Sequence, residues 1–164
     1  MPPELSRPLL LANVPAAGRQ LLVEATAEEC AALTARFGIE AVLTVRASLA
    51  LMPQDDGVVL AHGALAAEVV QLCVVSLEPV TQQLEAPLHL RLLPAGMAAG
   101  DGPDDLMDDI ESEAGTVDIG EVVAEELALA LDPYPRHPDA VLPPEATDDQ
   151  DNLFAALARL KKPN

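Results

Sequence analysis

Apolar and polar residues alternate with a period of two over three long stretches of the chain, residues 39–51, 59–69 and 80–92. A strand has this period because its successive side chains point to opposite faces of a sheet. Each stretch has one apolar face and one face that carries polar residues, which favours an antiparallel sheet with one solvated side. A doubly wound parallel sheet needs helices between its strands, and none fits between these stretches. Two shorter mixed runs, residues 5–11 and 19–25, are interpreted as strands or extended arms.

Two helices are predicted from their end residues. Thr26-Ala27-Glu28-Glu29 is a capping box, so the first helix should cover residues 27–37 and end at Gly38. Asp118 is suited to cap a second helix over residues 119–131, which the following Asp-Pro pair terminates.

These elements predict an α+β fold with a central antiparallel β-sheet, two main helices and a short C-terminal helix over residues 153–160. A barrel-like curl of the sheet stays open as an alternative form. We expect residues 1–132 to form a single α+β domain that includes an acidic loop at 96–116. Residues 133–164 are expected to be an extended, proline-rich segment that ends in the short helix.

The chain is strongly acidic: 27 Asp and Glu residues against nine Lys and Arg give its 164 residues a formal net charge of −18. Such a surface repels phosphate, and affinity for nucleic acids depends on Lys and Arg contacts to phosphate. Strong direct binding to DNA or RNA is therefore disfavoured, and so is binding to an anionic membrane. A candidate acidic interaction surface consists of Asp104, Asp105, Asp108, Asp109, Glu111, Glu113 and Glu121.

Motifs for catalysis or for a cofactor are not recognisable in the sequence. The two cysteines, Cys30 and Cys73, are too few for a disulfide framework or a four-thiolate zinc site. Cys73 lies in an apolar run and is interpreted as a small core residue, not an activated thiolate. We therefore expect a non-enzymatic protein without a cofactor or metal. The N-terminal residues lack signal-peptide character and no long apolar span occurs, which favours a cytoplasmic location.

Glu126 is unusual among the acidic residues because it falls on the apolar face of the second predicted helix. It lies seven positions after Ile119, about 20° from it around the helix axis. A buried carboxylate needs a cation or several hydrogen-bond donors. The favoured interpretation is a structural ion pair with an arginine, and the alternatives are a binding or catalytic role and escape to solvent. The candidate partners are Arg46, Arg91 and Arg136.

Four segments of the chain carry a recognisable order of motifs. They are Gln71-Leu72-Cys73-Val74-Val75-Ser76-Leu77-Glu78-Pro79-Val80, Val117-Asp118-Ile119-Gly120, residues 124–131 with Pro133-Tyr134-Pro135, and Leu153-Phe154-Ala155-Ala156-Leu157 with Leu160-Lys161-Lys162. Together they closely resemble the YceD family of large ribosomal RNA subunit accumulation proteins, from the Ser6-Arg7-Pro8 start to the basic tail. The family-motif positions are Cys73, Glu78, Pro79, Asp118, Glu125, Glu126, Leu127 and Phe154.

The resemblance implies a role in ribosome biogenesis, where family members are needed for large-subunit ribosomal RNA to accumulate. Many members carry Cys-x-x-Cys where this chain has Cys73-Val74-Val75-Ser76, so a metal or redox interpretation of that motif is unsupported here. Because the chain is so acidic, we expect it to contact a basic ribosomal protein or assembly factor and to affect the RNA through that partner. The alternative is a generic acidic protein-interaction module unrelated to ribosomes.

Overall fold

The computed structural model describes residues 3–100 and 106–142 of the chain. The predicted helix over residues 153–160 lies outside these ranges, as do Asp104, Asp105 and Phe154. Helices and strands occur together in the described ranges, which confirms the α+β class. No helix in these ranges is long and apolar enough to cross a membrane.

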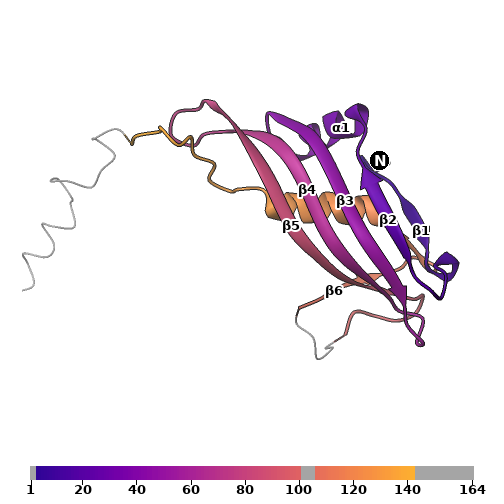
Figure 1. The fold of residues 1–164 in the computed structure, drawn as a ribbon. Helices are drawn as coiled ribbons and strands as arrows, with labels where there is room; N and C mark the ends of the chain where they lie inside the picture. Colours follow the sequence, from indigo (N-terminus) through magenta and orange to yellow (C-terminus); the bar gives the residue numbers. More distant parts are fainter. Residues whose placement is uncertain (1–2, 101–105, 143–164) are drawn as a thin grey trace, which may run out of the picture.

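The centre of the fold is a five-stranded sheet that consists, in spatial order, of β2 (Arg19–Glu24), β3 (Ala41–Pro53), β4 (Val59–Leu72), β5 (Pro79–Leu93) and β6 (Asp108–Glu111) (Figure 1). The first four strands pair antiparallel in chain order, as the alternating pattern predicts. The β3–β4 turn depends on Gly57, whose φ of 84° is a left-handed conformation that other residues rarely adopt.

Two short strands form a separate ribbon that joins the two ends of the domain. β1 (Pro8–Leu10) pairs antiparallel with β7 (Thr116–Asp118), and a 3-10 helix, Leu11–Asn13, follows β1. Neither the pairing nor its register is encoded in a local pattern, because each strand is only three residues long. This ribbon carries the chain from β6 into the second helix.

The two main helices begin at the predicted residues. In α1 (Ala27–Phe37) the Thr26 side chain accepts from the Glu29 amide, the Glu29 side chain accepts from the Thr26 amide, and Gly38 ends the helix with a φ of 63°. In α2 (Ile119–Ala130) the Asp118 side chain accepts from the amides of the first turn. Both caps satisfy N–H groups that a helix leaves without a partner in its own backbone.

The two faces of the sheet have different surroundings. Alternate residues of β3, β4 and β5 are buried, and their side chains form the core with α2, which lies behind the sheet in Figure 1. The opposite face carries mostly exposed side chains and is covered by no helix in the described part of the chain. The fully buried core residues include Leu33, Leu49, Leu65, Leu88, Leu90, Ile119 and Leu127.

Two expectations about the sheet are wrong. A barrel needs its outer strands to pair, whereas β2 and β6 are the free edges of an open sheet, and α2 covers the apolar face instead. The segment 96–116 is more than a loop, because it contains β6, which pairs parallel with β5 from Leu90 to Leu93. The alternation of apolar residues does not reveal β6, since three of its four residues are acidic.

Candidate functional site

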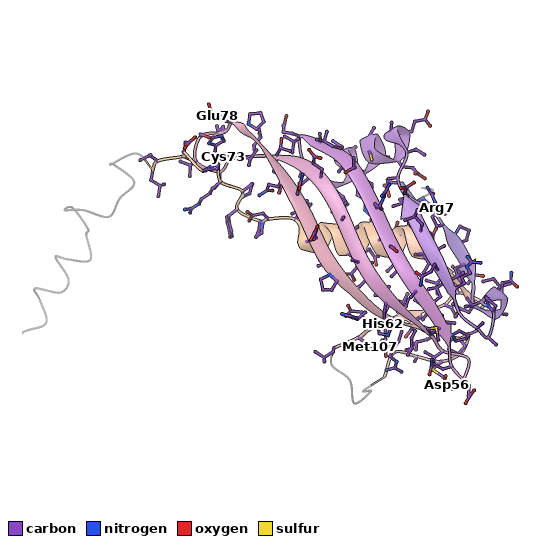
Figure 2. The ribbon with its side chains drawn as sticks, viewed as in Figure 1. Arg7, Asp56, His62, Cys73, Glu78 and Met107 are labelled. Atoms are coloured by element: carbon purple, nitrogen blue, oxygen red, sulfur yellow. The ribbon has the colours of Figure 1, made fainter. Side chains whose placement is uncertain are left out.

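The β4–β5 turn carries the first of the resemblance motifs and lies at the far end of the sheet, where Figure 2 shows Cys73 and Glu78. The Cys73 sulfur accepts backbone N–H groups from Val75 at 3.4 Å and from Ser76 and His137 at 3.3 Å each. The amide of Val74 donates to the Pro135 carbonyl at 2.9 Å. The turn therefore holds the segment that follows α2.

These hydrogen bonds change the chemistry of the thiol. The N–H of His137 and then the Ser76 side chain and amide lower the Cys73 pKa to about 6, against an ordinary 9.0. The side chain has no exposed surface, so it is a buried residue, as the apolar run indicates, but it is also an acceptor that the sequence did not reveal. Ser76 occupies the second cysteine position of the Cys-x-x-Cys motif, and its amide now donates to the remaining sulfur.

Asp132 connects the C-terminal end of α2 to the same end of the sheet. Gln71 of β4 donates to the Asp132 carbonyl at 3.0 Å, and Gln82 of β5 donates to its carboxylate at 3.4 Å. The Tyr134 amide donates to the other carboxylate oxygen at 2.9 Å. The motifs around Gln71 and Tyr134 thus fix where α2 ends.

Asp118 fixes the other end of α2. Its carboxylate accepts from the Ser6 hydroxyl and the Arg7 amide at 2.6 Å each, as well as from the amides of Gly120 and Glu121. Burial opposes ionisation of this carboxyl, yet the hydrogen bonds from Ser6, Arg7 and the first turn outweigh it and lower its pKa. A motif residue that looks like a simple helix cap therefore also holds the start of the chain.

Arg7, labelled in Figure 2, extends this connection to α1 through Glu29. Its guanidinium binds both carboxylate oxygens of Glu29, at 2.7 and 3.0 Å, and also the Glu24 carbonyl at 2.9 Å. The guanidinium hydrogen bonds lower the Glu29 pKa to about 2. Arg36 of α1 makes a second bridge, to Glu4 and to Glu121 of α2.

Glu126 does not form the expected ion pair. Arg46 pairs with Glu24 and Arg91 pairs with Asp109 at 3.3 Å, and in residues 3–100 and 106–142 neither they nor Arg136 pair with Glu126. The half-buried Glu126 carboxyl has a raised pKa, first because burial removes water from it and then because Asp108 and Glu125 repel its charge. We call Asp108, Glu125 and Glu126 the carboxylate cluster.

The predicted acidic surface is only partly available. Asp109 is paired with Arg91, the Glu111 carboxylate accepts from the Ala99 amide at 2.8 Å, and Glu121 is bound to Arg36 at 2.7 Å. Asp108 and Glu113 remain exposed. The carboxylate cluster joins residues of β6 and α2 and shares only Asp108 with the acidic surface predicted from the sequence.

The histidines do not assemble a metal centre with the acidic residues. His62 and His89 lie opposite each other on the open face of the sheet, with their Nδ1 atoms 3.1 Å apart. Within the part of the chain that the structure describes, no three His, Cys, Asp or Glu side chains are grouped so that they could hold a metal ion.

Fold and site together define an acidic α+β domain whose shared motifs hold both ends of a helix that presents a carboxylate cluster. Residues 61–161 match the family described as large ribosomal RNA subunit accumulation protein YceD, and the chain belongs to this family. The resemblance inferred from the motifs is thus confirmed, and the match contains all the motif positions from Cys73 to Phe154. No curated protein and no solved structure matches the chain.

Proposed function

We propose that this protein is a non-enzymatic ribosome biogenesis factor that acts on large-subunit ribosomal RNA through a basic ribosomal protein or assembly factor. The family description supplies the connection to the accumulation of this RNA. The partner is argued from the carboxylate cluster, because Glu126 is half-buried and the charges of Asp108 and Glu125 repel its own.

Charge supports an indirect action on the RNA. The net charge of −18 makes the long-range field of the protein repulsive toward phosphate. The same field attracts a cationic protein and accelerates its association. A basic partner can therefore bridge this chain to ribosomal RNA, which by itself the chain binds poorly.

The carboxylate cluster is suited to such a partner because it holds unrelieved charge. A carboxylate that is partly desolvated and close to two others is less stable as an anion than one in water. A lysine or arginine placed beside Glu126 would reverse the repulsion from Asp108 and Glu125, so binding there gains more than at an isolated surface carboxylate. The motif contacts at Asp118 and Asp132 keep the helix that carries the cluster in place.

The test is co-sedimentation of the protein with ribosomal particles from growing cells on sucrose gradients. The wild type should migrate with precursors of the large subunit, and the double variant Asp108→Asn with Glu126→Gln should lose this association while its circular dichroism stays unchanged. The control variant Glu40→Gln with Asp55→Asn removes the same charge from exposed positions outside the cluster and should still co-sediment.

Two results would overturn the proposal. The first is a wild-type protein that never migrates with large-subunit precursors, which would fit a generic acidic interaction module. The second is tight binding of naked large-subunit RNA near physiological salt with a steep salt dependence, because the basic intermediary would then be unnecessary.

A further inference from the structure

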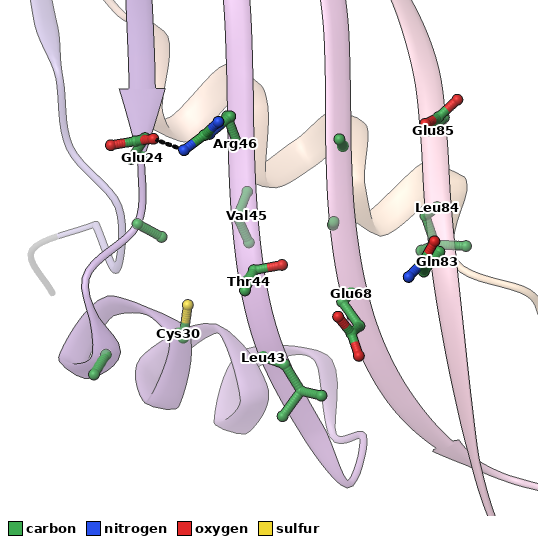
Figure 3. A pocket seen from close by; sticks show the side chains of 14 residues that line it. Glu24, Cys30, Leu43, Thr44, Val45, Arg46, Glu68, Gln83, Leu84 and Glu85 are labelled. Atoms are coloured by element: carbon green, nitrogen blue, oxygen red, sulfur yellow. Dashed lines mark ion pairs between the residues drawn. The ribbon is translucent and has the colours of Figure 1, made fainter.

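The open face of the sheet has a hollow beside α1, which Figure 3 shows from close by. Its volume is about 550 Å³, which lies in the range of sites that enclose a small ligand or a few side chains. The exposed Leu43 of β3 contributes apolar surface, and Cys30 of α1 lies at one side. We call this hollow the sheet-face groove.

The register of the strands explains why the groove exists. Arg46 of β3, Ala66 of β4 and Glu85 of β5 form one row across the sheet. All three side chains are exposed, and the short alanine stands between two long ones. The methyl group of Ala66 therefore forms a floor, and its long neighbours form the walls.

The charge of the groove is negative. Three glutamates line it, and the one arginine of the lining, Arg46, is already bound to Glu24. Glu68 and Glu85 are diagonal neighbours on β4 and β5, and neither forms an ion pair within the described ranges. Two carboxylates thus stand beside an apolar floor without a cation.

We propose that the sheet-face groove docks an extended cationic segment of a partner protein. The hydrocarbon stem of a lysine or arginine would lie on Ala66, and its charged end would reach Glu68 and Glu85. In an extended segment, side chains two residues apart point the same way, so alternate basic residues can follow the two glutamates along one face. The inference deepens the proposed function and rests on it, since it gives the basic partner a second contact away from the carboxylate cluster.

The first test fills the groove without changing its charge. A fluorescent synthetic peptide in which lysine and threonine alternate is titrated with the full-length protein near physiological salt, and its anisotropy is measured. Ala66→Leu should weaken binding by about tenfold, because the leucine occupies the floor. Ala64→Leu is the matched control, since Ala64 is exposed on the same face of β4 but does not line the groove, and it should bind as the wild type does.

The second test removes charge. Glu68→Gln with Glu85→Gln should weaken binding of the same peptide by about threefold to tenfold, the sum expected for two partly exposed ion pairs. The control with equal charge loss is Glu40→Gln with Asp55→Asn, which should change binding by much less. Equal affinity of Ala66→Leu and Ala64→Leu, or equal effects of the two double variants, would overturn the proposal.

Other occupants of the groove are also separated by these measurements. If the wild type binds the peptide only after residues 143–164 are removed, this C-terminal part of the chain itself occupies the groove. If analytical ultracentrifugation shows a dimer that Ala66→Leu dissociates, a second copy occupies it. Either result would refute the partner segment.

Peptide affinity and co-sedimentation together distinguish an error in the groove proposal from an error in the proposed function. Asp108→Asn with Glu126→Gln should abolish co-sedimentation but change peptide affinity much less than Glu68→Gln with Glu85→Gln does, because these residues do not line the groove. Peptide binding with wild-type affinity to Ala66→Leu would reject the groove alone. Peptide binding by a wild-type protein that does not co-sediment with large-subunit precursors would reject the ribosomal role alone.

Discussion

The backbone amide of His137 donates a hydrogen bond to the sulfur of Cys73 at 3.3 Å, although 64 residues separate the two. Two further amides of the Cys73 turn share the same acceptor. The sulfur thus organises its own turn and also anchors the segment that leaves α2. Cys73 therefore helps to hold the segment around His137 against the β4–β5 turn.

Substitution of Cys73 by alanine should lower the melting temperature by a few degrees, because three partly buried N–H groups lose their acceptor. The effect should depend on pH. Folding lowers the thiol pKa to about 6 from 9.0, so its contribution is complete above pH 9, shrinks as the pH falls and disappears below pH 6. Thermal unfolding of wild type and variant between pH 6 and pH 9 measures this.

Cys30→Ala provides the control for that experiment. Burial raises the pKa of the Cys30 thiol instead of lowering it, so this thiol stays protonated through most of the same range. Its substitution should give a difference in melting temperature that does not grow from pH 6 to pH 8. A Cys73→Ala difference that is equally flat would contradict the role of the thiolate.

The Arg7–Glu29 pair should stabilise the fold by about 1–2 kcal/mol at neutral pH, because it is bidentate and partly shielded from water. Glu29→Gln should therefore reduce the free energy of unfolding in urea by that amount. Folding lowers the Glu29 pKa to about 2 from 4.5, so the difference should be full above pH 4.5 and vanish as the pH approaches 2. The neighbouring Glu28→Gln should change stability by less than about 0.5 kcal/mol.

Gly120→Ala should destabilise the protein although alanine is the better helix former. A Cβ at this position would lie 2.6 Å from the Leu5 carbonyl oxygen and 2.8 Å from the Arg7 nitrogen, and the backbone must move to relieve this. Such overpacking costs about 1–3 kcal/mol, more than the ~1 kcal/mol gained in helix propensity. Gly100→Ala, where the nearest atom would be 3.9 Å away, should be neutral in the same chemical denaturation experiment.

Glu126→Gln should raise the melting temperature at pH 7, contrary to what a structural ion pair would require. Burial and the charges of Asp108 and Glu125 raise the Glu126 pKa on folding, so this carboxyl favours the folded state more when it is protonated than when it is ionised. The gain should disappear below the ordinary pKa of 4.5. A lower melting temperature of the variant at pH 7 would show that Glu126 has a cationic partner after all.

Local sequence signals were sufficient to predict the elements whose ends or buried faces are determined by neighbouring residues. The capping box at Thr26 and the cap at Asp118 need only neighbouring residues, and the three long strands announce their buried face by alternation. Both helices therefore begin where the sequence predicts. The family could also be inferred from the sequence, because four motif segments occur in the family's order along the chain.

Contacts between distant residues could not be derived in this way. The residues around Arg7 do not indicate that it binds Glu29. The sequence likewise does not show that Asp109 of β6 lies beside Arg91 and pairs with it. Arg91 pairs with Asp109 because the parallel pairing of β6 with β5 places these two residues opposite each other. The carboxylate cluster likewise depends on where β6 lies, which has no periodic signature.

The pairing of β1 with β7 has a consequence for synthesis of the protein on the ribosome. Pro8 is matched to Asp118, so β1 must wait for more than a hundred later residues to be made before it can pair with β7. Such non-local closure is slow, and until then the apolar side of the nascent strands lacks the helix that shields it. The domain can complete its fold only after β7 and α2 have emerged, and until then its exposed apolar surface makes the nascent chain prone to aggregation.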